Sequence, residues 1–420
     1  MTTAPRDSAS SYLERVAGQA GKVGQRARRA VLLVRPSTVQ GLVYSRRPSR
    51  ARGDDEHLRD AIAWLGRAQD ATPDGGVSAA FDLTTGWRPS YPETTGYIVP
   101  TMLHHAEICA ADDSRRRAVQ MGEWLRSVQR EDGSIGRGLW SGENDTGKRA
   151  EVFNTGQVLF GYVALAEQTE DLAMIDAATR AANWLSSHQN PDGSWTAHSL
   201  GGVPHTYYTR VAWALARAGS VLDEPAWSEA ARRCADWTAG LQHDNGWIDL
   251  MAFTPGTDPL THTIAYTIEG LLECGLVLGS ERAWSAGVTA CDAMARSYAA
   301  PAGCRLPRRG ELSATVDSEW RASARYSCPT GSAQLALCCQ RVAAVDGRDD
   351  LAEFADELVQ TVKASQPGPS APPDQRGGIP GSMPIWGRYA SLRYLNWATK
   401  FTADMLLDRI AGGLPRERYG

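Results

Sequence analysis

The sequence lacks the features that mark most membrane, secreted and nucleic-acid-binding proteins. No segment reaches the ~18 consecutive apolar residues of a membrane-spanning helix, and the first residues show no charged region followed by an apolar run and a cleavage site. The formal net charge is only −4, and no helix-turn-helix or zinc-finger pattern occurs. We therefore expect no nucleic-acid partner, no export through a signal peptide and no transmembrane segment.

Closely spaced cysteines are also missing. The eight cysteines are scattered over 420 residues, in a chain that is too long to need disulfide bonds for its stability. No cluster has the tight spacing of a metal site. This distribution indicates reduced thiols in a cytoplasm and predicts no bound metal or cofactor.

Positive charge is concentrated at the start of the chain. Residues 1–52 contain eleven Arg and Lys residues against Asp7 and Glu14. Within this arm, the apolar residues 31–34 lie between arginines, a pattern that suits an anionic membrane surface, although a solvated tail has the same composition. We expect a flexible basic arm over 1–52, a single domain over 53–420, and a cytoplasmic protein that can lie at the inner face of the membrane.

A six-residue repeat with Trp at its first position and Gln at its last indicates the architecture. It occurs as WLGRAQ at 64–69, WLRSVQ at 124–129, WLSSHQ at 184–189 and WTAGLQ at 237–242. An Asp-Gly or Asn-Gly turn follows each copy, where glycine accepts a positive φ. The tryptophans are 60, 60 and 53 residues apart, so each period holds a helix, a turn and a second helix.

Two sets of helices alternate along residues 53–420. The first set is amphipathic and charged, which predicts an outer ring, and covers 57–70, 115–130, 173–190, 226–242, 283–298 and 349–366. The second set is apolar almost all round, which predicts an inner ring, and covers 93–109, 152–168, 205–219, 261–279, 326–345 and 392–411. Because polar capping repeats are missing, a closed ring is favoured over a solenoid. The sequence predicts an all-α fold, an (α/α)6 toroid or barrel of six helical hairpins, with essentially no sheet.

The repeat, with the DGSW that follows it at 192–195, resembles the QW-type repeats of squalene cyclases and the repeats of protein prenyltransferase β subunits, which are α/α barrels. The likeness covers residues 57–250. Residues 75–78 and 90–97 resemble more closely a segment of the polysaccharide-biosynthesis proteins that are encoded in bacterial exopolysaccharide gene clusters. This resemblance implies an oligosaccharide or a lipid-linked glycan as substrate.

The chain departs from the cyclases and prenyltransferases at the residues that carry their chemistry. No Asp-x-Asp-Asp acid motif occurs, and Asp54-Asp55 stands before the first helix in a different context. The prenyltransferases hold a catalytic zinc with Asp, Cys and His. Asp317, Cys328 and His262 are of these types but are widely spaced in the chain. Neither polyene cyclisation nor zinc catalysis is therefore favoured.

Side chains at the beginnings of the inner helices should ring one mouth of the barrel, which makes them the candidate site. The candidates for catalysis are His262, Tyr207, Arg210, Glu93 and His205. The candidates for substrate binding are Tyr91, Asn154, Tyr208, Tyr266, Trp386, Asn396, Trp397 and Lys400. Tyrosine and tryptophan rings at these places can stack on sugars or on isoprenoid chains.

Each catalytic candidate has a chemical role and a plain structural alternative. Glu93 is either a cavity acid or a residue favoured by the helix N-terminus, and His205 or His262 either removes a proton near neutral pH or makes an ordinary hydrogen bond. Tyr207 and Arg210 share a helix face, where the guanidinium could grip a substrate carboxylate or both side chains could pack against a neighbouring helix. Hydrolysis would need a pair of carboxylates, and Glu93 has no evident partner in the sequence.

Three functions remain open at this point. The leading one is a carbohydrate-active enzyme of exopolysaccharide biosynthesis or modification, with lyase or epimerase chemistry on a glycan that contains uronic acid. The second is an isoprenoid-handling barrel of the terpene cyclase or prenyltransferase kind. The third is a non-catalytic glycan-binding scaffold in a membrane-bound synthesis complex.

Overall fold

The computed structural model describes residues 52–142, 149–306 and 310–412. The basic arm predicted for residues 1–52, with its membrane contact, lies outside the described residues except for Arg52. Within the described ranges, no helix combines the length and the hydropathy that crossing a bilayer requires.

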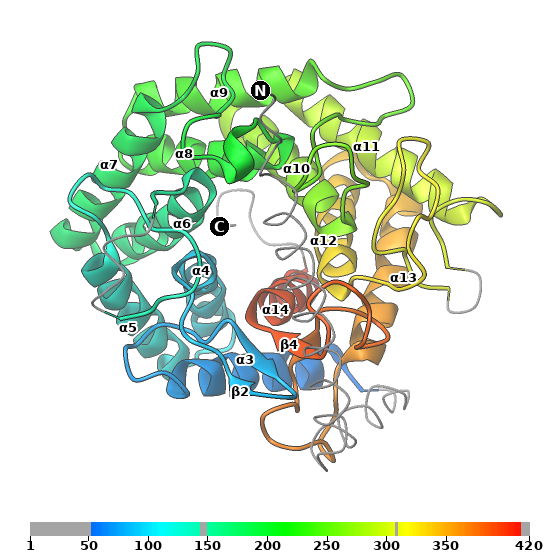
Figure 1. The fold of residues 1–420 in the computed structure, drawn as a ribbon, viewed down its shortest axis with the longest axis horizontal. Helices are drawn as coiled ribbons and strands as arrows, with labels where there is room; N and C mark the ends of the chain where they lie inside the picture. The colour runs from blue at the N-terminus through cyan, green and yellow to red at the C-terminus, as the bar shows by residue number, and fades with distance from the viewer. Residues whose placement is uncertain (1–51, 143–148, 307–309, 413–420) are drawn as a thin grey trace, which may run out of the picture.

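The described helices form two concentric rings (Figure 1). The inner ring comprises α4 Pro92–Ile108, α6 Val152–Thr169, α8 Thr209–Val221, α10 Thr261–Leu278, α12 Pro329–Asp346 and α14 Asn396–Ile410. The outer ring comprises α3 Asp54–Asp70, α5 Asp112–Val128, α7 Leu172–Ser187, α9 Pro225–Ala239, α11 Glu281–Ala299 and α13 Asp349–Ser365. Each inner helix packs against the next, and α14 packs against α4. The predicted all-α toroid of six helical hairpins is therefore confirmed.

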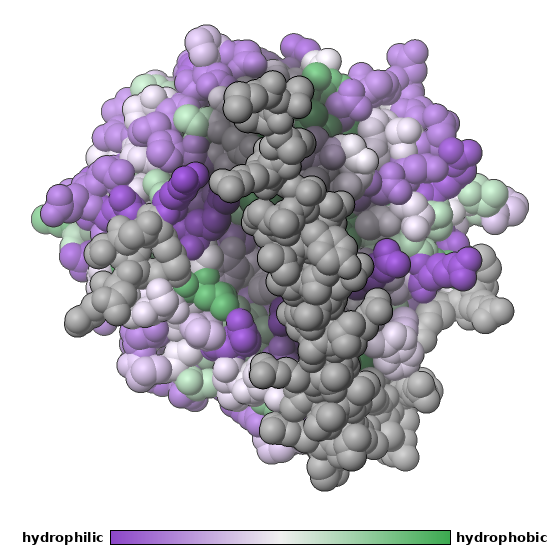
Figure 2. Space-filling model, viewed as in Figure 1, coloured by the Kyte–Doolittle hydropathy of each residue, from purple (hydrophilic) through white to green (hydrophobic). Residues whose placement is uncertain are grey.

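The two rings differ in burial as their sequences predict. Every residue of α6 from Val152 to Val163 is buried, because this helix packs against both neighbours and against the outer ring. In α5 the buried residues include Ala118, Met121 and Leu125, which are spaced three or four apart and lie on one face. Hydrophilic side chains predominate on the described part of the surface in Figure 2.

The tightly packed helix pairs differ from those expected from the repeat. Among the outer helices, each inner helix packs mainly against the one that follows it, as α4 does against α5, and α14 packs against α3. The connections within the consecutive pairs are two or three residues long, whereas those that contain the Asp-Gly turns are much longer. A short connection makes the following helix the antiparallel neighbour. The first helix of the chain therefore completes the sixth hairpin with the last.

The glutamine of the repeat has a structural role that explains its fixed position. Gln69, Gln129, Gln189 and Gln242 each donate from Nε2 to the glycine carbonyl of the following turn, over 3.0–3.3 Å. The same Nε2 donates to a backbone carbonyl of the next outer helix, over 2.8–3.2 Å. One amide group, with its two N–H donors, therefore joins the end of one outer helix, its turn and the next outer helix.

Gln366 repeats this arrangement where the ring closes. Its Nε2 donates to the Gly377 carbonyl over 3.0 Å and to the His57 carbonyl of α3 over 3.1 Å. Arg52 donates to Gln366 Oε1 over 3.0 Å as well. No tryptophan repeat precedes Gln366, so the sequence pattern alone does not mark it as a fifth copy.

The tryptophans of the repeat are not all equivalent. Trp64, Trp124 and Trp184 are at most 5% exposed on outer helices, whereas Trp237 is only partly buried, so the four copies do not pack equivalently. In α9 the buried tryptophan is Trp227, whose Nε1 donates to Asn183 of α7 over 3.0 Å. Trp227 thus packs α9 against its neighbour in place of Trp237.

One small sheet departs from the expected absence of strands. β1 Ala80–Asp82, β2 Gly86–Trp87, β3 Ile379–Pro380 and β4 Arg393–Leu395 pair antiparallel in the order β2-β1-β4-β3. Ring closure brings the segments before α4 and α14 side by side, and pairing satisfies their backbone hydrogen bonds. The sheet therefore joins the first and last parts of the toroid.

Alanine at Gly193 should lower the free energy of unfolding by more than alanine at Gly201. Both glycines have positive φ, 93° and 70°, so each alanine costs about 1–2 kcal/mol. At Gly193 the new Cβ would also lie 2.4 Å from the Arg233 carbonyl oxygen of α9, whereas the nearest atom at Gly201 is 3.9 Å away. Urea unfolding of both variants measures the difference. Equal losses would contradict a role of this turn in fixing α9.

Candidate functional site

A pocket of about 240 Å³ opens where the inner helices begin. Its wall comes from the first turns of α4, α6, α10 and α14, from the short helical segments η2 Leu200–Gly202 and η3 Thr206–Tyr208, and from loops. The lining residues are Tyr91, Glu93, Tyr97, Arg137, Glu151, Phe153, Asn154, Leu200, Tyr207, Tyr208, Phe253, His262, Tyr266, Tyr389 and Trp397.

The structure brings together eight of the thirteen site residues predicted from the sequence. Those that line the pocket are Glu93, Tyr207, His262, Tyr91, Asn154, Tyr208, Tyr266 and Trp397. They come from the hairpins of α4, α6, α8, α10 and α14, and closure of the ring brings Trp397 of α14 to the others. The other five, Arg210, His205, Asn396, Lys400 and Trp386, do not line it.

Glu93 lies in the first turn of α4 and is partly exposed to the pocket. Burial raises the pKa of its carboxyl group to about 7, and the nearby Glu151 adds to this effect. The Tyr91 hydroxyl donates to Glu93 Oε2, which stabilises the ionised form and limits the shift. A carboxyl group that titrates near neutral pH can give a proton to a substrate oxygen.

Glu151 immediately precedes α6 and supplies the second carboxyl group of the pocket. Its Oε2 accepts from Arg137 Nε over 2.5 Å, and its Oε1 accepts from the Tyr208 hydroxyl over 3.2 Å. Burial raises its pKa, while Arg137 opposes the shift. The expectation that Glu93 has no carboxylate partner is therefore wrong, because the partner comes from the next inner helix.

His262 is a buried, neutral imidazole in the first turn of α10. Burial lowers its pKa to about 4. Its Nδ1 lies 2.5 Å from Gln334 Oε1, and Gln334 Nε2 donates to Glu269 Oε2 over 3.3 Å. Because Gln334 presents its carbonyl oxygen, the imidazole proton is on Nδ1. Nε2 is then left as the basic nitrogen.

Aromatic rings form most of the pocket wall. Phe153 lies 5.4 Å from Tyr207, 5.7 Å from Tyr208 and 5.3 Å from Tyr266, measured between ring centroids. Elsewhere in the wall, Trp397 Nε1 donates to the hydroxyl of Tyr389 over 3.1 Å. These aromatic rings are flat, and neighbouring side chains fix their orientation. A ligand with flat apolar faces can therefore stack on them.

Arg210 does not face the pocket, which corrects its predicted role in gripping a substrate carboxylate. Its side chain is 0% exposed, and its Nη1 donates to Glu269 Oε2 over 2.5 Å. Its Nε donates to Gln157 Oε1 over 3.0 Å. The guanidinium lies within 6 Å of five aromatic rings, including Tyr97 and Tyr266 of the pocket wall. Its partners lie on neighbouring inner helices, so it fills the bore beneath the site.

Of four further candidates, three make contacts within the protein and the fourth lies outside the pocket. Both ring nitrogens of His205 face backbone carbonyls, those of Leu200 and Ala252. Asn396 is 0% exposed and donates to the Ser78 carbonyl and to Thr94 Oγ1. Lys400, also 0% exposed, pairs with Asp404 over 2.6 Å. Trp386 is 44% exposed and lies outside the pocket lining. The expected convergence of these residues on the pocket is therefore not observed.

The described residues contain no group of three or more His, Cys, Asp and Glu side chains that could hold a metal ion. Of the three residues considered for zinc, His262 is hydrogen-bonded to Gln334, and Asp317 accepts a hydrogen bond from Arg321 Nε over 3.0 Å. Cys328 is fully buried, which raises the pKa of its thiol to about 11. No zinc role for these residues follows from the geometry.

Several lining residues escaped prediction because they follow no helical pattern. Arg137 and Phe253 come from the long connections between outer and inner helices, and Tyr389 from the loop before β4. Glu151 could have been found, because it stands directly before an inner helix, as Tyr91 does. Arg137 is the one cation among the described lining residues, and its side chain is 43% exposed.

Comparison with known sequences gives a local likeness only. No family model matches the chain. A stretch of 110 residues is 32% identical to the squalene–hopene cyclase of Zymomonas mobilis subsp. mobilis, and the match covers 22% of this chain and 16% of the cyclase. The chain thus matches a small part of this relative's length.

Several solved structures match the fold of this chain over nearly the whole of their own length. An unsaturated glucuronyl hydrolase specific for heparin has a TM-score of 0.64 at 16% identity, covering 86% of this chain and 98% of that one. The cellobiose 2-epimerase of Bacillus thermoamylovorans B4167 has a TM-score of 0.69 at 10% identity, with coverages of 86% and 98%. A D-mannose isomerase has a TM-score of 0.67 at 12% identity, with coverages of 86% and 100%. The chain shares their fold.

Proposed function

We propose that this protein is a carbohydrate-processing enzyme that binds one end of a glycan and acts by general acid–base catalysis. The observation that carries the proposal is that two carboxyl groups, Glu93 and Glu151, share one aromatic-walled pocket and that the pKa of Glu93 is about 7. The structurally similar proteins are a glucuronyl hydrolase, an epimerase and a sugar isomerase, which supports a sugar substrate.

The dimensions of the pocket favour a chain end over the middle of a glycan. Its volume is about 240 Å³, and the buried Arg210, Glu269 and Gln157 fill the bore beneath it. An extended chain therefore has no continuous path through the barrel. The walls formed by Phe153 and Trp397 can stack on the faces of one or two sugar rings.

A carboxyl pair suits hydrolysis of a glycosidic bond. Protonated Glu93 gives its proton to the leaving oxygen as the bond to the anomeric carbon breaks. Ionised Glu151, held by Arg137 and Tyr208, takes a proton from the water that attacks this carbon. After the reaction Glu93 is ionised and Glu151 is protonated. Transfer of one proton from Glu151 to Glu93 restores the starting state.

Elimination or epimerisation on a uronic acid is the other chemistry that the pocket supports. The basic Nε2 of His262 would remove the proton next to the substrate carboxylate, and the Tyr207 or Glu93 hydroxyl would protonate the leaving oxygen or the opposite face. Arg137, in place of the buried Arg210, is the cation available to that carboxylate. Arg137 would then exchange its partner Glu151 for the substrate carboxylate.

The segment that resembles exopolysaccharide-cluster proteins contains both Tyr91 and Glu93. The part of the chain with this likeness therefore forms one wall of the pocket. On this basis we propose that the substrate is a bacterial exopolysaccharide or its lipid-linked precursor.

The test is product analysis on a panel of oligosaccharides with and without uronic acid, using wild type and the variants Glu151→Gln and His262→Gln. Hydrolysis gives new reducing ends and should be lost mainly in Glu151→Gln. Elimination gives an unsaturated uronate that absorbs ultraviolet light, and epimerisation gives an isomer visible by NMR; both should be lost mainly in His262→Gln. Glycan binding without any turnover in wild type would favour the scaffold function and reject catalysis.

An isoprenoid substrate is the second candidate, because the pocket wall is largely aromatic and part of the chain is similar to a squalene–hopene cyclase. Aromatic faces stabilise carbocations as well as sugar rings. Incubation with squalene and with polyprenyl diphosphates, followed by mass spectrometry, separates the two. A cyclised or transferred isoprenoid, together with an inactive glycan panel, would replace the carbohydrate proposal.

A further inference from the structure

The imidazole of His262 is one end of a series of hydrogen bonds that runs beneath the pocket through α10, α12, α8 and α6. Its Nδ1 lies 2.5 Å from Gln334 Oε1, and Gln334 Nε2 donates to Glu269 Oε2 over 3.3 Å. Arg210 donates to the same Oε2 over 2.5 Å and to Gln157 Oε1 over 3.0 Å. Gln334, Arg210 and Gln157 are 0% exposed, so water does not compete for these bonds.

The charged end of this series sets the direction of the bonds that follow. The Arg210 guanidinium can only donate, and the Glu269 carboxylate that pairs with it can only accept. Gln334 therefore turns its N–H group towards Glu269 and its carbonyl oxygen towards His262. In the reverse orientation, a carbonyl oxygen would face the carboxylate at 3.3 Å with no proton between the two acceptors. The imidazole must then donate from Nδ1, which leaves the lone pair on Nε2.

Nε2 is the ring nitrogen that remains for a ligand. His262 lines the pocket, and its ring centroid lies 4.4 Å from that of Tyr266 and 6.0 Å from that of Tyr389. None of the described residues hydrogen-bonds Nε2. A hydroxyl of the substrate, or the C–H group next to its carboxylate, can therefore take this place.

We propose that Gln334 is a positioning residue, which keeps His262 in the tautomer whose Nε2 accepts from the substrate. Arg210 and Glu269 orient Gln334 and do not line the pocket themselves. In elimination or epimerisation, Nε2 takes the proton next to the carboxylate, and the C–H electron pair stays with the substrate. In hydrolysis, Nε2 accepts a hydrogen bond from a sugar hydroxyl. The effect on turnover rests on the proposed function, whereas the tautomer can be measured without a substrate.

A neutral amide suits this role better than a charged partner does. Burial and the positive charge of Arg210 lower the pKa of His262 to about 4, so the ring is neutral at pH 7 and can take a proton. A carboxylate at position 334 would instead stabilise the imidazolium, which has no lone pair. The other charged groups of the pocket lining, which the test variants leave in place, are Glu93, Glu151 and Arg137.

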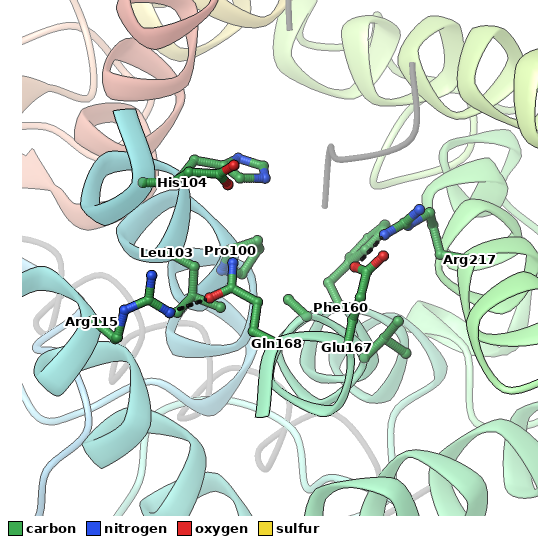
Figure 3. Close-up of a pocket in the computed structure, with 11 residues that line it drawn as sticks. Pro100, Leu103, His104, Arg115, Phe160, Glu167, Gln168 and Arg217 are labelled. Atoms are coloured by element: carbon green, nitrogen blue, oxygen red, sulfur yellow. Dashed lines mark hydrogen bonds and ion pairs between the residues drawn. The ribbon is translucent and has the colours of Figure 1, made fainter. Parts of the chain in front are cut away.

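The other end of the inner helices provides a matched control. Figure 3 shows the cavity of about 410 Å³ that lies there between α4, α6 and α8. Gln168 of α6 accepts from Arg115 over 2.7 Å, and the neighbouring Glu167 pairs with Arg217 over 2.9 Å. Gln168 thus has a polar partner, as Gln334 has, but it does not line the pocket of His262. Gln168→Glu therefore makes the same chemical change away from the imidazole.

Nuclear magnetic resonance of the full chain, labelled at the histidine ring nitrogens, measures the tautomer directly. Long-range proton–nitrogen spectra distinguish the two ring nitrogens, and the spectrum of His262→Gln identifies the signals of His262. In wild type, Nδ1 should carry the only ring proton from about pH 5.5 to 8. Gln334→Met removes the acceptor and should give a mixture of both tautomers. Gln334→Glu should keep the ring doubly protonated at about pH 6, and Gln168→Glu should match wild type.

The wild-type spectrum decides the question even where a variant fails to fold. A ring proton on Nε2 in wild type would overturn the proposal, because Gln334 would then present its N–H group to His262. An unchanged single tautomer in a folded Gln334→Met would overturn it as well, since another group would be setting the tautomer.

Turnover gives a second readout. On a glycan that wild type converts, Gln334→Met should lower kcat/KM at least about tenfold, through kcat where Nε2 removes a proton and through KM where it binds a hydroxyl. A mixed tautomer with unchanged kcat/KM would overturn the positioning role. If wild type has the expected tautomer but converts no glycan, the proposed function fails, and only the fixed orientation of His262 is supported.

Discussion

Replacing Glu93 with Gln should stabilise the protein at alkaline pH by about 3 kcal/mol and abolish its turnover. The pKa of Glu93 is raised from 4.5 to about 7, so the folded protein binds its proton more tightly than the unfolded chain does. This contribution favours folding below about pH 4.5 and is lost as the pH rises through 7. At pH 8 the folded protein must hold Glu93 as an ionised carboxylate in the pocket wall. This costs about 1.4 kcal/mol of folding free energy for each unit by which the pKa is raised.

Gln has the same shape and can still accept the hydrogen bond from Tyr91, but it carries neither charge nor acid proton. Urea unfolding of Glu93→Gln should therefore match wild type at pH 4 and exceed it at pH 8. Glu123→Gln, at an exposed position on α5, is the control and should change stability at neither pH. A loss of stability at pH 8 in Glu93→Gln would show that the carboxyl group is ionised at little cost and is no proton donor.

The activity of wild type should decline as the pH rises above about 7, since the proton on Glu93 is then missing. Tyr91→Phe should shift this decline to higher pH, because the variant loses the hydroxyl that stabilises the ionised form. A pH profile of kcat/KM for wild type and Tyr91→Phe measures the shift. The same profile in both would mean that another group supplies the proton.

Replacing Arg210 with Met should destabilise the protein by about 3–5 kcal/mol, because it leaves Glu269 as a buried charge without its partner. The Arg210 side chain is 0% exposed and that of Glu269 is 11% exposed. Replacing both, as Arg210→Met/Glu269→Gln, should recover more than half of the loss. The neutral amide that the second substitution places at position 269 still accepts from Gln334 Nε2, so the support of His262 remains.

Thermal and urea unfolding of the two single variants and the double variant give the coupling energy. The exposed pair of Arg116 and Asp113, with side chains 54% and 64% exposed, provides the control. Arg116→Met should cost no more than about 1 kcal/mol. If the loss in Arg210→Met/Glu269→Gln equals the sum of the losses in the two single variants, the charge pair does not stabilise the bore.

The positions of the helices could be predicted closely from the sequence, because burial on one face or on all faces leaves a periodic pattern. The predicted inner helix at 152–168 is observed at Val152–Thr169, and the predicted outer helix at 173–190 at Leu172–Ser187. The small sheet could not be predicted, since its strands are two or three residues long and pair only after the ring closes. Gln366 also matched no motif, although it makes the same contacts as the glutamines of the repeat.

The candidate site was predictable as a region but not as a set of contacts. Residues that begin inner helices were expected at one mouth, and Glu93, Tyr207 and His262 do line one pocket. Sequence position does not say how far a side chain lies below the rim. Arg210 is only three residues after Tyr207, yet its longer side chain points into the bore and pairs with Glu269.

The amino-acid sequence by itself determined the toroid, because apolar periodicity and the tryptophan–glutamine repeat are local patterns that each hairpin satisfies independently. Only the tertiary structure decided the chemistry of the pocket. Glu151 becomes the partner of Glu93 because two hairpins meet at one pocket, and Arg137 becomes the cation of the site through its hydrogen bond to Glu151. The pKa values of the two carboxyl groups depend on burial and on charged neighbours in the folded pocket, and no local pattern records these.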